Sequence, residues 1–319
     1  MGLVPTIDLR GEIAGMAAEI DRAASEVGFF RVVGHGLDPA VEAAAWQAAR
    51  DFFALDERRK LAVRIPPGDA YGYGPFAAER LAASLGEVTP PDLKETFSIG
   101  PDLDAVAAEV AADPAARFVF SPTPWPSGLP GFEATMRAYY DDLASLVERI
   151  MAVMAIAVAL PADAFAAAID RHTSALRLLH YPDTDGREVE PGQMRAGAHT
   201  DYGTLTLLRS DDAPGGLQVR DLGGTWHDVP PVDGAYVVNV GDALARWTND
   251  RWRSTLHRVV VPPGNHASTT ERQSIAFFHN ANWDAVIECL PTCLAEGEAP
   301  GYEAVTAGRH LMDKFRSTQ

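Results

Sequence analysis

The motif Ala198-His199-Thr200-Asp201-Tyr202-Gly203 opens the stretch of sequence that decides the fold, which runs over residues 196–278. The same stretch contains Leu256-His257-Arg258-Val259 and Glu271-Arg272-Gln273-Ser274. His199 and Asp201 are two residues apart, so in an extended backbone their side chains leave the same face of the strand. His257 lies far enough along the chain for several antiparallel strands to fold back and bring it beside this pair.

These side chains are of the types that bind a metal. Two histidines and one carboxylate on one face of a metal, with the other positions open, form the arrangement of non-heme Fe(II) oxygenases. Arg272 and Ser274 are again two residues apart, and a guanidinium beside a hydroxyl suits a small carboxylate. The alternative is that both histidines are hydrogen-bonded in the core and that Arg272 makes a structural ion pair. The types and spacing of the ligands favour the metal site.

Short β-rich segments surround these motifs. They cover residues 175–181, 205–208, 217–220, 235–239, 257–261 and 273–278, and clusters of Gly, Pro, Asp and Asn separate them. Many short strands without intervening helices predict an antiparallel sandwich or a jelly roll.

Helical patterns dominate the part of the chain before these strands. A strand is predicted over residues 4–9 and another over 28–36, and each precedes an amphipathic helix, over 12–26 and 39–54 respectively. A long helix over 132–160 becomes apolar all round in its last turns, so we expect it to pack beneath the core. A shorter helix is predicted from Pro161 to Asp170, and the tail after residue 280 reads as irregular except at 310–315.

Residues 64–130 read as irregular and are rich in Pro, Gly and Asp. Long ordered loops in compact enzymes often cover a site, so this segment is the candidate for a lid that faces the substrate, with Tyr71 in it. A plain surface connection is the alternative.

The composition is that of a globular protein with a large core. The chain has 319 residues, of which 47% are hydrophobic and 22% charged. The net charge of −17 argues against nucleic acid and against anionic membranes as partners. No apolar run is long enough to cross a bilayer, no secretory signal is visible, and only two cysteines occur, Cys289 and Cys293. We therefore expect a cytoplasmic protein with no obligate protein partner.

Motifs spread along nearly the whole chain resemble one known family. They are Val4-Pro5-Thr6-Ile7-Asp8-Leu9, Gly28-Phe29-Phe30, Gly34-His35-Gly36, Leu178-Leu179-His180-Tyr181-Pro182, His199-Thr200-Asp201, Gly215-Gly216-Leu217-Gln218-Val219, Asn239-Val240-Gly241-Asp242, His257-Arg258-Val259 and Arg272-Gln273-Ser274. In these the sequence is similar to the isopenicillin N synthase-like branch of the Fe(II)/2-oxoglutarate-dependent oxygenases. It departs from many plant members in its longer segment between His257 and Arg272, where we expect a hairpin extension.

The resemblance implies a mainly β fold with helices, namely a double-stranded β-helix (jelly roll) core wrapped by N-terminal and central helices. It implies one oxygenase domain over residues 1–319, with an N-terminal region over 1–120 and the Fe(II)/2-oxoglutarate-binding core over 171–282. By the same resemblance His199, Asp201 and His257 are the iron ligands. The distal carboxylate of 2-oxoglutarate is then held by Arg272, Ser274 and Tyr181.

The implied function is oxidation of a small-molecule substrate by hydroxylation, desaturation or cyclisation. The reaction uses Fe(II), 2-oxoglutarate and O2 and releases succinate and CO2. One alternative is an Fe(II) oxidase of the same branch that needs no 2-oxoglutarate, and another is an inactive barrel that only binds a small molecule. A zinc hydrolase is possible from the ligands alone, but Arg272 and Ser274 would then lack a purpose.

Three side chains are candidates to face the substrate: Arg177, Phe278 and Tyr71. Arg177 shares a strand face with Tyr181, and an inward arginine is costly unless it meets an anion. That anion is either a carboxylate of the substrate or of 2-oxoglutarate, or an internal acid such as Glu95. Phe278 shares a face with Arg272 and Ser274, although a core aromatic is the alternative. Asn239 and Asp242 are expected to shape a turn rather than to take part in chemistry.

Overall fold

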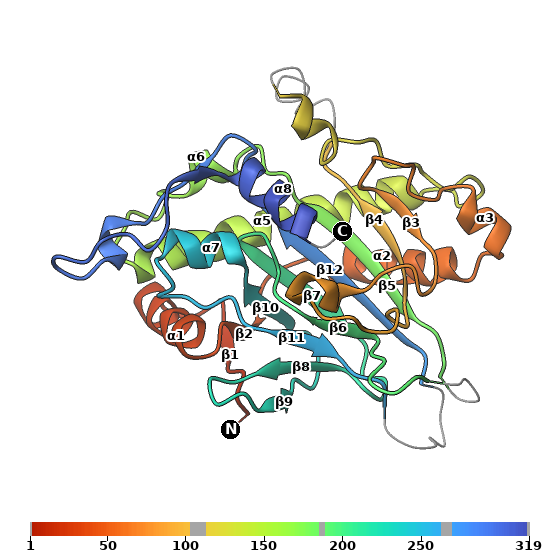
Figure 1. Ribbon diagram of the computed structural model, residues 1–319, viewed down its shortest axis with the longest axis horizontal. Helices are drawn as coiled ribbons and strands as arrows, with labels where there is room; N and C mark the ends of the chain where they lie inside the picture. The colour runs from red at the N-terminus through yellow and green to blue at the C-terminus, as the bar shows by residue number, and fades with distance from the viewer. Residues whose placement is uncertain (1, 103–112, 185–188, 263–269, 318–319) are drawn as a thin grey trace.

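The computed structural model describes residues 2–102, 113–184, 189–262 and 270–317, and its largest element is an eight-stranded sheet (Figure 1). The strand order is β1-β2-β10-β7-β12-β5-β4-β3. The strands are β1 (Thr6–Asp8), β2 (Phe29–Val33), β3 (Gly72–Gly74), β4 (Glu95–Ile99), β5 (Ala175–Tyr181), β7 (Leu205–Ser210), β10 (Tyr236–Val240) and β12 (Arg272–His279). The pairs are antiparallel except for β1 with β2.

A smaller sheet lies against this large sheet and closes the barrel. It has the order β6-β11-β8-β9, formed by β6 (Ala196–His199), β11 (His257–Val259), β8 (Leu217–Arg220) and β9 (Trp226–Asp228). Leu179 and Ala276 of the large sheet pack directly against Ala196 and Val259 of the small sheet. The apolar faces of both sheets therefore meet inside, and the predicted jelly roll is confirmed.

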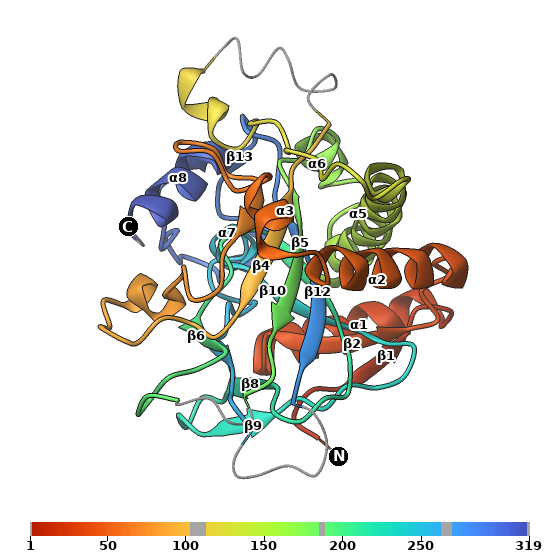
Figure 2. The same cartoon turned by 90° about the vertical axis from the view of Figure 1, so that its right-hand side faces the viewer.

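Helices cover the outer face of the large sheet (Figure 2). The three that pack there are α1 (Ile13–Glu26), α2 (Pro39–Phe53) and α5 (Phe132–Ala157), and their apolar faces join the underside of β5 and β12 in the main core. The remaining elements are α3 (Glu57–Leu61), α6 (Ala166–Ile169), α7 (Asp242–Trp247), α8 (Ala307–Ser317), the 3-10 turns η1 (Leu81–Leu85), η2 (Pro114–Arg117) and η3 (Pro291–Cys293), and the hairpin β13 (Val286–Ile287) with β14 (Val305–Thr306).

A lid over residues 64–130 stays a prediction, but the expectation that these residues are irregular is wrong at two places in that segment. It contains β3 and β4, and β4 pairs along its length with β5 in the large sheet. All five residues of β4 are buried, including three polar ones, so the strand lacks the alternation of polar and apolar residues that reveals a half-buried strand. The connection between β3 and β4 reaches the barrel interior, where Leu81 packs.

Two further predictions about secondary structure are wrong in part, and a third concerns residues outside the described ranges. The helix predicted from Pro161 begins only at Ala166, and the tail predicted as irregular holds β13 and β14. The hairpin extension expected between His257 and Arg272 falls mainly on residues 263–269, outside the described residues.

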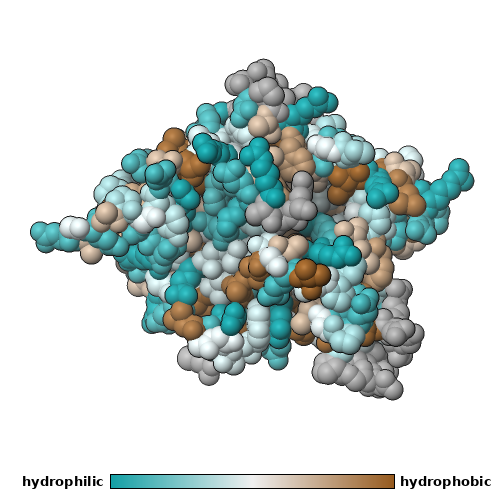
Figure 3. Space-filling model, viewed as in Figure 1, coloured by the Kyte–Doolittle hydropathy of each residue, from teal (hydrophilic) through white to brown (hydrophobic). Residues whose placement is uncertain are grey.

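The surface is mostly hydrophilic on the face that Figure 3 shows. The apolar residues on it stand in small separate groups. Among the described residues, no helix combines the length and the apolar character needed to cross a membrane.

Candidate active site

Two short antiparallel strands place the two histidines of the candidate metal centre side by side. His257 at the start of β11 pairs with His199 at the end of β6, and their ring centroids are 4.3 Å apart. Asp201 follows two residues after β6, and its Oδ1 lies 3.7 Å from His199 Nε2 and 3.6 Å from His257 Nε2. One ligand atom from each of the three side chains lies within 4.8 Å of the other two, so a single ion can reach all three.

Backbone carbonyl groups hold both imidazole rings in the form that binds a metal. His199 Nδ1 donates to the carbonyl of Gly197 at 2.7 Å, and His257 Nδ1 donates to the carbonyl of Thr255 at 3.1 Å. Because a carbonyl oxygen can only accept, the proton sits on Nδ1 and the lone pair of Nε2 faces Asp201. Burial, and then the neighbouring His257, lower the pKa of His199 to about 3, which favours the neutral ring.

Asp201 uses one carboxylate oxygen within the protein and keeps the other for the histidines. Its Oδ2 accepts hydrogen bonds from Thr206 Oγ1 at 2.6 Å and from Asn239 Nδ2 at 2.7 Å. Burial alone would raise the pKa of Asp201, but the two histidines and these two bonds together lower it. The expectation that Asn239 shapes a turn is therefore wrong, because Asn239 is buried in β10 and orients this carboxylate.

Arg272 and Ser274 lie deeper in the barrel, on β12 beside β5. Their cross-strand partners on β5 are Tyr181 and Leu179, and the Arg272 guanidinium lies 4.9 Å from the centre of the Tyr181 ring. Arg272 is only 3% exposed and Ser274 only 1%. Among the described residues, Arg272 Nη1 and Ser274 Oγ are both buried without a hydrogen-bond partner. Buried donors are normally satisfied, so this pair is shaped for an anion.

A second buried arginine reinforces the positive charge at this end of the barrel. Arg195 donates to the carbonyls of Pro214, at 2.8 Å, and Thr270, and its guanidinium lies 5.9 Å from the centre of the Tyr181 ring. Burial, and then the charge of Arg272, lower its pKa to about 10. Sequence reasoning missed Arg195, since it precedes β6 in a loop and no motif marks it.

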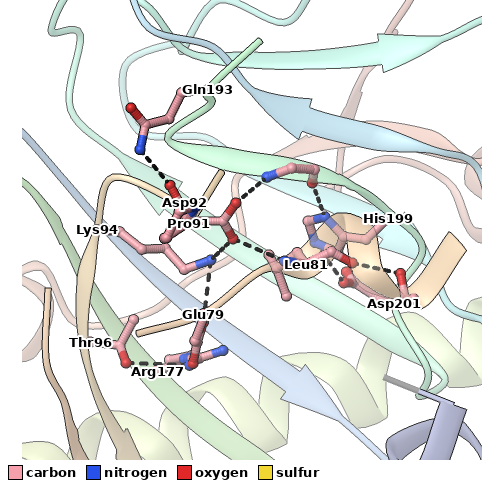
Figure 4. A network of polar contacts seen from close by, with 12 residues as sticks. Glu79, Leu81, Pro91, Asp92, Lys94, Thr96, Arg177, Gln193, His199 and Asp201 are labelled. Atoms are coloured by element: carbon pink, nitrogen blue, oxygen red, sulfur yellow. Dashed lines mark hydrogen bonds and ion pairs between the residues drawn. The ribbon is translucent and has the colours of Figure 1, made fainter. Parts of the chain in front are cut away.

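Arg177 belongs to a connected group of charged side chains, which we call the charged cluster: Glu79, Asp92, Lys94 and Arg177 (Figure 4). Arg177 pairs with Glu79 and lies 3.3 Å from Thr96 Oγ1. Lys94 Nζ bridges the two acids, 3.3 Å from Glu79 Oε2 and 2.9 Å from Asp92 Oδ2.

The charged cluster is linked to the candidate metal centre through one glycine. Asp92 Oδ1 accepts a hydrogen bond from the Gly197 amide at 2.9 Å. The carbonyl of the same Gly197 accepts the bond from His199 (Figure 4). The cluster and the histidine therefore share one rigid peptide segment.

Glu95, named as a possible partner of Arg177, points elsewhere. The register of β4 sets Glu95 opposite His180, whose side chain leaves the opposite face of β5 from Arg177. Glu95 accepts hydrogen bonds from Lys60 at 2.7 Å, from Tyr73 at 2.5 Å and from His180 at 2.7 Å. The internal acid that Arg177 meets is Glu79.

The two remaining candidates lie in different surroundings. Phe278 is half-buried and packs against the interior cluster that contains Tyr181 and Ala276. Tyr71 is 3% exposed, and its hydroxyl donates to the carbonyl of Val119 at 2.7 Å. Since its polar group is already used, the structure gives Tyr71 a packing role beside the sheet and no support for a role in facing the substrate.

Two family models match the chain. That of the 2OG-Fe(II) oxygenase superfamily matches residues 172–281. That of the non-haem dioxygenase in morphine synthesis N-terminal region matches residues 4–128. Both the strand-rich core and the helical N-terminal part are therefore similar to known families.

Individual relatives match over most of their own length. A 2-oxoglutarate-Fe(II) type oxidoreductase of Emericella nidulans is 35% identical, over 96% of this chain and 85% of its own. A homoarginine-6-hydroxylase of Oryza sativa subsp. japonica is 33% identical, over 92% of this chain and 87% of its own. Among solved structures, a full-length Neurospora crassa protein in complex with alpha-KG and thymine is 33% identical, with a TM-score of 0.84 over 99% of this chain and 97% of that one.

Proposed function

Because this chain belongs to the 2OG-Fe(II) oxygenase superfamily, we propose that His199, Asp201 and His257 hold its iron and that Arg272, Ser274 and Tyr181 hold 2-oxoglutarate. The chain is an Fe(II)- and 2-oxoglutarate-dependent oxygenase that acts on a small molecule. When bound, iron and 2-oxoglutarate together activate dioxygen, and the substrate is oxidised with release of succinate and CO2.

One observation supports the cosubstrate assignment above the others. Arg272 Nη1 and Ser274 Oγ are buried donors without partners among the described residues. A buried guanidinium is costly unless an anion meets it, and a carboxylate can accept from both groups at once. A zinc hydrolase leaves these two donors without an assigned purpose, whereas a 2-oxoglutarate-free oxidase would have to use them for a carboxylate of its own substrate.

The protein's own residues supply position and protonation state. The bonds from His199 and His257 to the carbonyls of Gly197 and Thr255 fix both histidine tautomers, so each Nε2 can bind a metal without first losing a proton. Thr206 and Asn239 orient Asp201 so that Oδ1 remains available. Tyr181 and Phe278 belong to an apolar cluster that packs between the two sheets beside these groups.

The substrate side of the site holds Arg177 and Phe278. Both share the inward strand faces that carry Tyr181 and Ser274, so a substrate entering the barrel meets them. One matched protein is a homoarginine hydroxylase and another was crystallised with thymine, which supports a small polar substrate here.

Two proposals concern the chain as a whole. Residues 1–120 and 171–282 work as one domain, since the N-terminal strands β1 to β4 complete the sheet of the core. Cys289 and Cys293 are both free thiols, which suits a reducing, cytoplasmic setting.

An anaerobic titration tests the assignments together. Fe(II) and then 2-oxoglutarate are added to the protein, and the weak visible charge-transfer band of an iron-chelated 2-oxo acid is followed. We expect the band in the natural protein, no iron binding in His199→Ala, and iron binding without the band in Arg272→Ala at the same 2-oxoglutarate concentration. A band of normal strength in Arg272→Ala would contradict the cosubstrate assignment. Iron binding of normal strength in His199→Ala would contradict the metal assignment.

A further inference from the structure

The charged cluster lies at the inner face of the barrel, next to the candidate metal centre. Arg177 faces Ala276 across the β5–β12 pair, and Ala276 belongs to the interior cluster with Tyr181. On the other side, Leu81 follows Glu79 by two residues and packs onto that same interior cluster. The segment that carries Glu79 therefore folds over the site, and Figure 4 shows Glu79 and Arg177 turned toward each other.

Glu79 and Arg177 are partly accessible and not fully used by the protein. Their side chains are 29% and 20% exposed, respectively. Arg177 Nε is nevertheless buried without a hydrogen-bond partner among the described residues. Glu79 Oε2 likewise has only its ion-pair contact with Lys94, 3.3 Å away, and no hydrogen bond. The two side chains therefore hold one donor and one acceptor that make no hydrogen bond among the described residues.

The charges of the cluster balance. Glu79 and Asp92 are acids, and Lys94 and Arg177 are bases, so the four side chains sum to zero. Burial alone would raise the pKa of Glu79, but Arg177 and Lys94 lower it to about 2, so the side chain is a carboxylate that can only accept. A ligand with a net charge would leave that charge uncompensated in a half-buried site, which is costly.

We propose that Glu79 and Arg177 form the recognition pair for the substrate, which is a small molecule of zero net charge with an acceptor oxygen for Arg177 and an N–H group for Glu79. This inference rests on the proposed function. Two kinds of compound share this chemistry: zwitterionic amino acids, and neutral cyclic amides or imides. Glu79 acts by contact with the substrate, and Lys94 and Asp92 hold Glu79 in place.

The test uses the protein loaded anaerobically with Fe(II) and 2-oxoglutarate. One set of probes is free amino acids and a second is neutral cyclic amides, including pyrimidine bases. A third set contains simple carboxylic acids and amines that have only one of the two groups. Binding is read from the change that a probe causes in the charge-transfer band, and turnover from succinate formed after oxygen is admitted. We expect binding in the first or second set and none in the third.

Two variants of Glu79 separate the two kinds of substrate. Glu79→Gln keeps an acceptor oxygen but loses the charge, so it should weaken binding of an ammonium at least about 30-fold and spare an amide N–H. Glu79→Met removes the acceptor and should weaken both at least about 30-fold, with the change in KM rather than in kcat. Arg177→Met removes the donor to the acceptor oxygen of the substrate and should likewise weaken binding of both kinds of compound at least about 30-fold. The control is Glu288→Gln, which changes an exposed carboxylate after β13 and should alter the binding of neither kind of compound.

The outcomes are distinguishable. If the band forms and the third set binds as well as the first two, or if Glu79→Met binds the best probe as the natural protein does, the recognition pair is wrong while the proposed function stands. If no band forms at all, the proposed function fails and this inference fails with it. Thermal unfolding of each variant shows whether the fold is intact, and Glu79→Gln provides the test if Glu79→Met does not fold.

Discussion

Asn239 donates a 2.7 Å hydrogen bond to Oδ2 of Asp201 across 38 positions of sequence. The bond runs from the large sheet, where Asn239 lies on β10, to the turn that follows β6 in the small sheet. It holds the carboxylate with Oδ1 turned to the histidines, so the geometry of the candidate metal centre depends on a residue that touches no metal.

Asn239→Ala should lower the affinity for Fe(II) by about 10- to 100-fold, because partners of this kind orient metal ligands. The measurement is a competitive Fe(II) titration, read beside circular dichroism to establish that the fold is retained. Thr206→Val removes the other bond to the same oxygen and should have an effect of the same direction. An unchanged Fe(II) dissociation constant in both variants would mean that the carboxylate needs no such support.

Arg272→Ala should weaken 2-oxoglutarate binding by at least about 30-fold while Fe(II) binding stays near normal, since a buried charge pair with the cosubstrate is lost. Ser274→Ala should cost about 1 kcal/mol, the size of one ordinary hydrogen bond. Titration of the charge-transfer band with 2-oxoglutarate measures both. Arg309→Ala, at an exposed position of α8, is the matched control. Equal losses in Arg272→Ala and in the control would refute the assignment.

Gly203→Ala should destabilise the fold by about 1–3 kcal/mol, because the new methyl group would run into the carbonyl of His279. The same clash should displace the turn that carries Asp201 and reduce Fe(II) affinity. Gly216→Ala is the control, since its methyl group would meet nothing within 4 Å and the change in stability should stay within about 0.5 kcal/mol. Urea unfolding measures both, and equal stabilities would disprove the steric argument.

Glu95→Gln should make the protein less stable above pH 4.5, and the deficit should shrink as the pH falls below that value. Burial alone would raise the pKa of Glu95, but hydrogen bonds from His180, Lys60 and Tyr73 lower it from 4.5 to about 2. A carboxyl group whose pKa is lower in the folded state than in the unfolded chain stabilises the fold above the unfolded pKa. That stabilisation is lost as the pH falls from 4.5 toward 2. Unfolding curves of both proteins at about pH 6 and about pH 3.5 measure the gap, and a gap that widens in acid would contradict this.

Much of the fold could be predicted because its signals are local. Six strands, β5, β7, β8, β10, β11 and β12, coincide with the predicted short β-rich runs between turn residues, and His257 begins one of them. The runs do not include β6 or β9, which are only four and three residues long. What escaped prediction depends on pairing. β4 carries three buried polar residues, so neither its pattern nor its composition separates it from a loop.

The site divides in the same way. His199, Asp201 and His257 could be predicted as metal ligands from their residue types and spacing. Asn239 and Arg195 could not be predicted, because their contacts in the site follow from the fold and not from a spacing in the sequence. The partner of Arg177 could be foreseen as an acid but not as Glu79, because the choice is set by the register of β4. That register turns Glu95 to the other face of the sheet.

The two halves of the site come from different sheets. β6, the turn after it and β11 carry the candidate iron ligands, and β5 and β12 of the large sheet carry the residues proposed to hold 2-oxoglutarate. If these residues hold iron and 2-oxoglutarate as proposed, the bound pair would connect the two sheets. At a concentration about 100 times its dissociation constant, a ligand that binds only the folded protein adds about 2.7 kcal/mol of stability. We therefore expect the lifetime of this protein in the cell to depend on the supply of iron and of 2-oxoglutarate, with the unloaded chain degraded first.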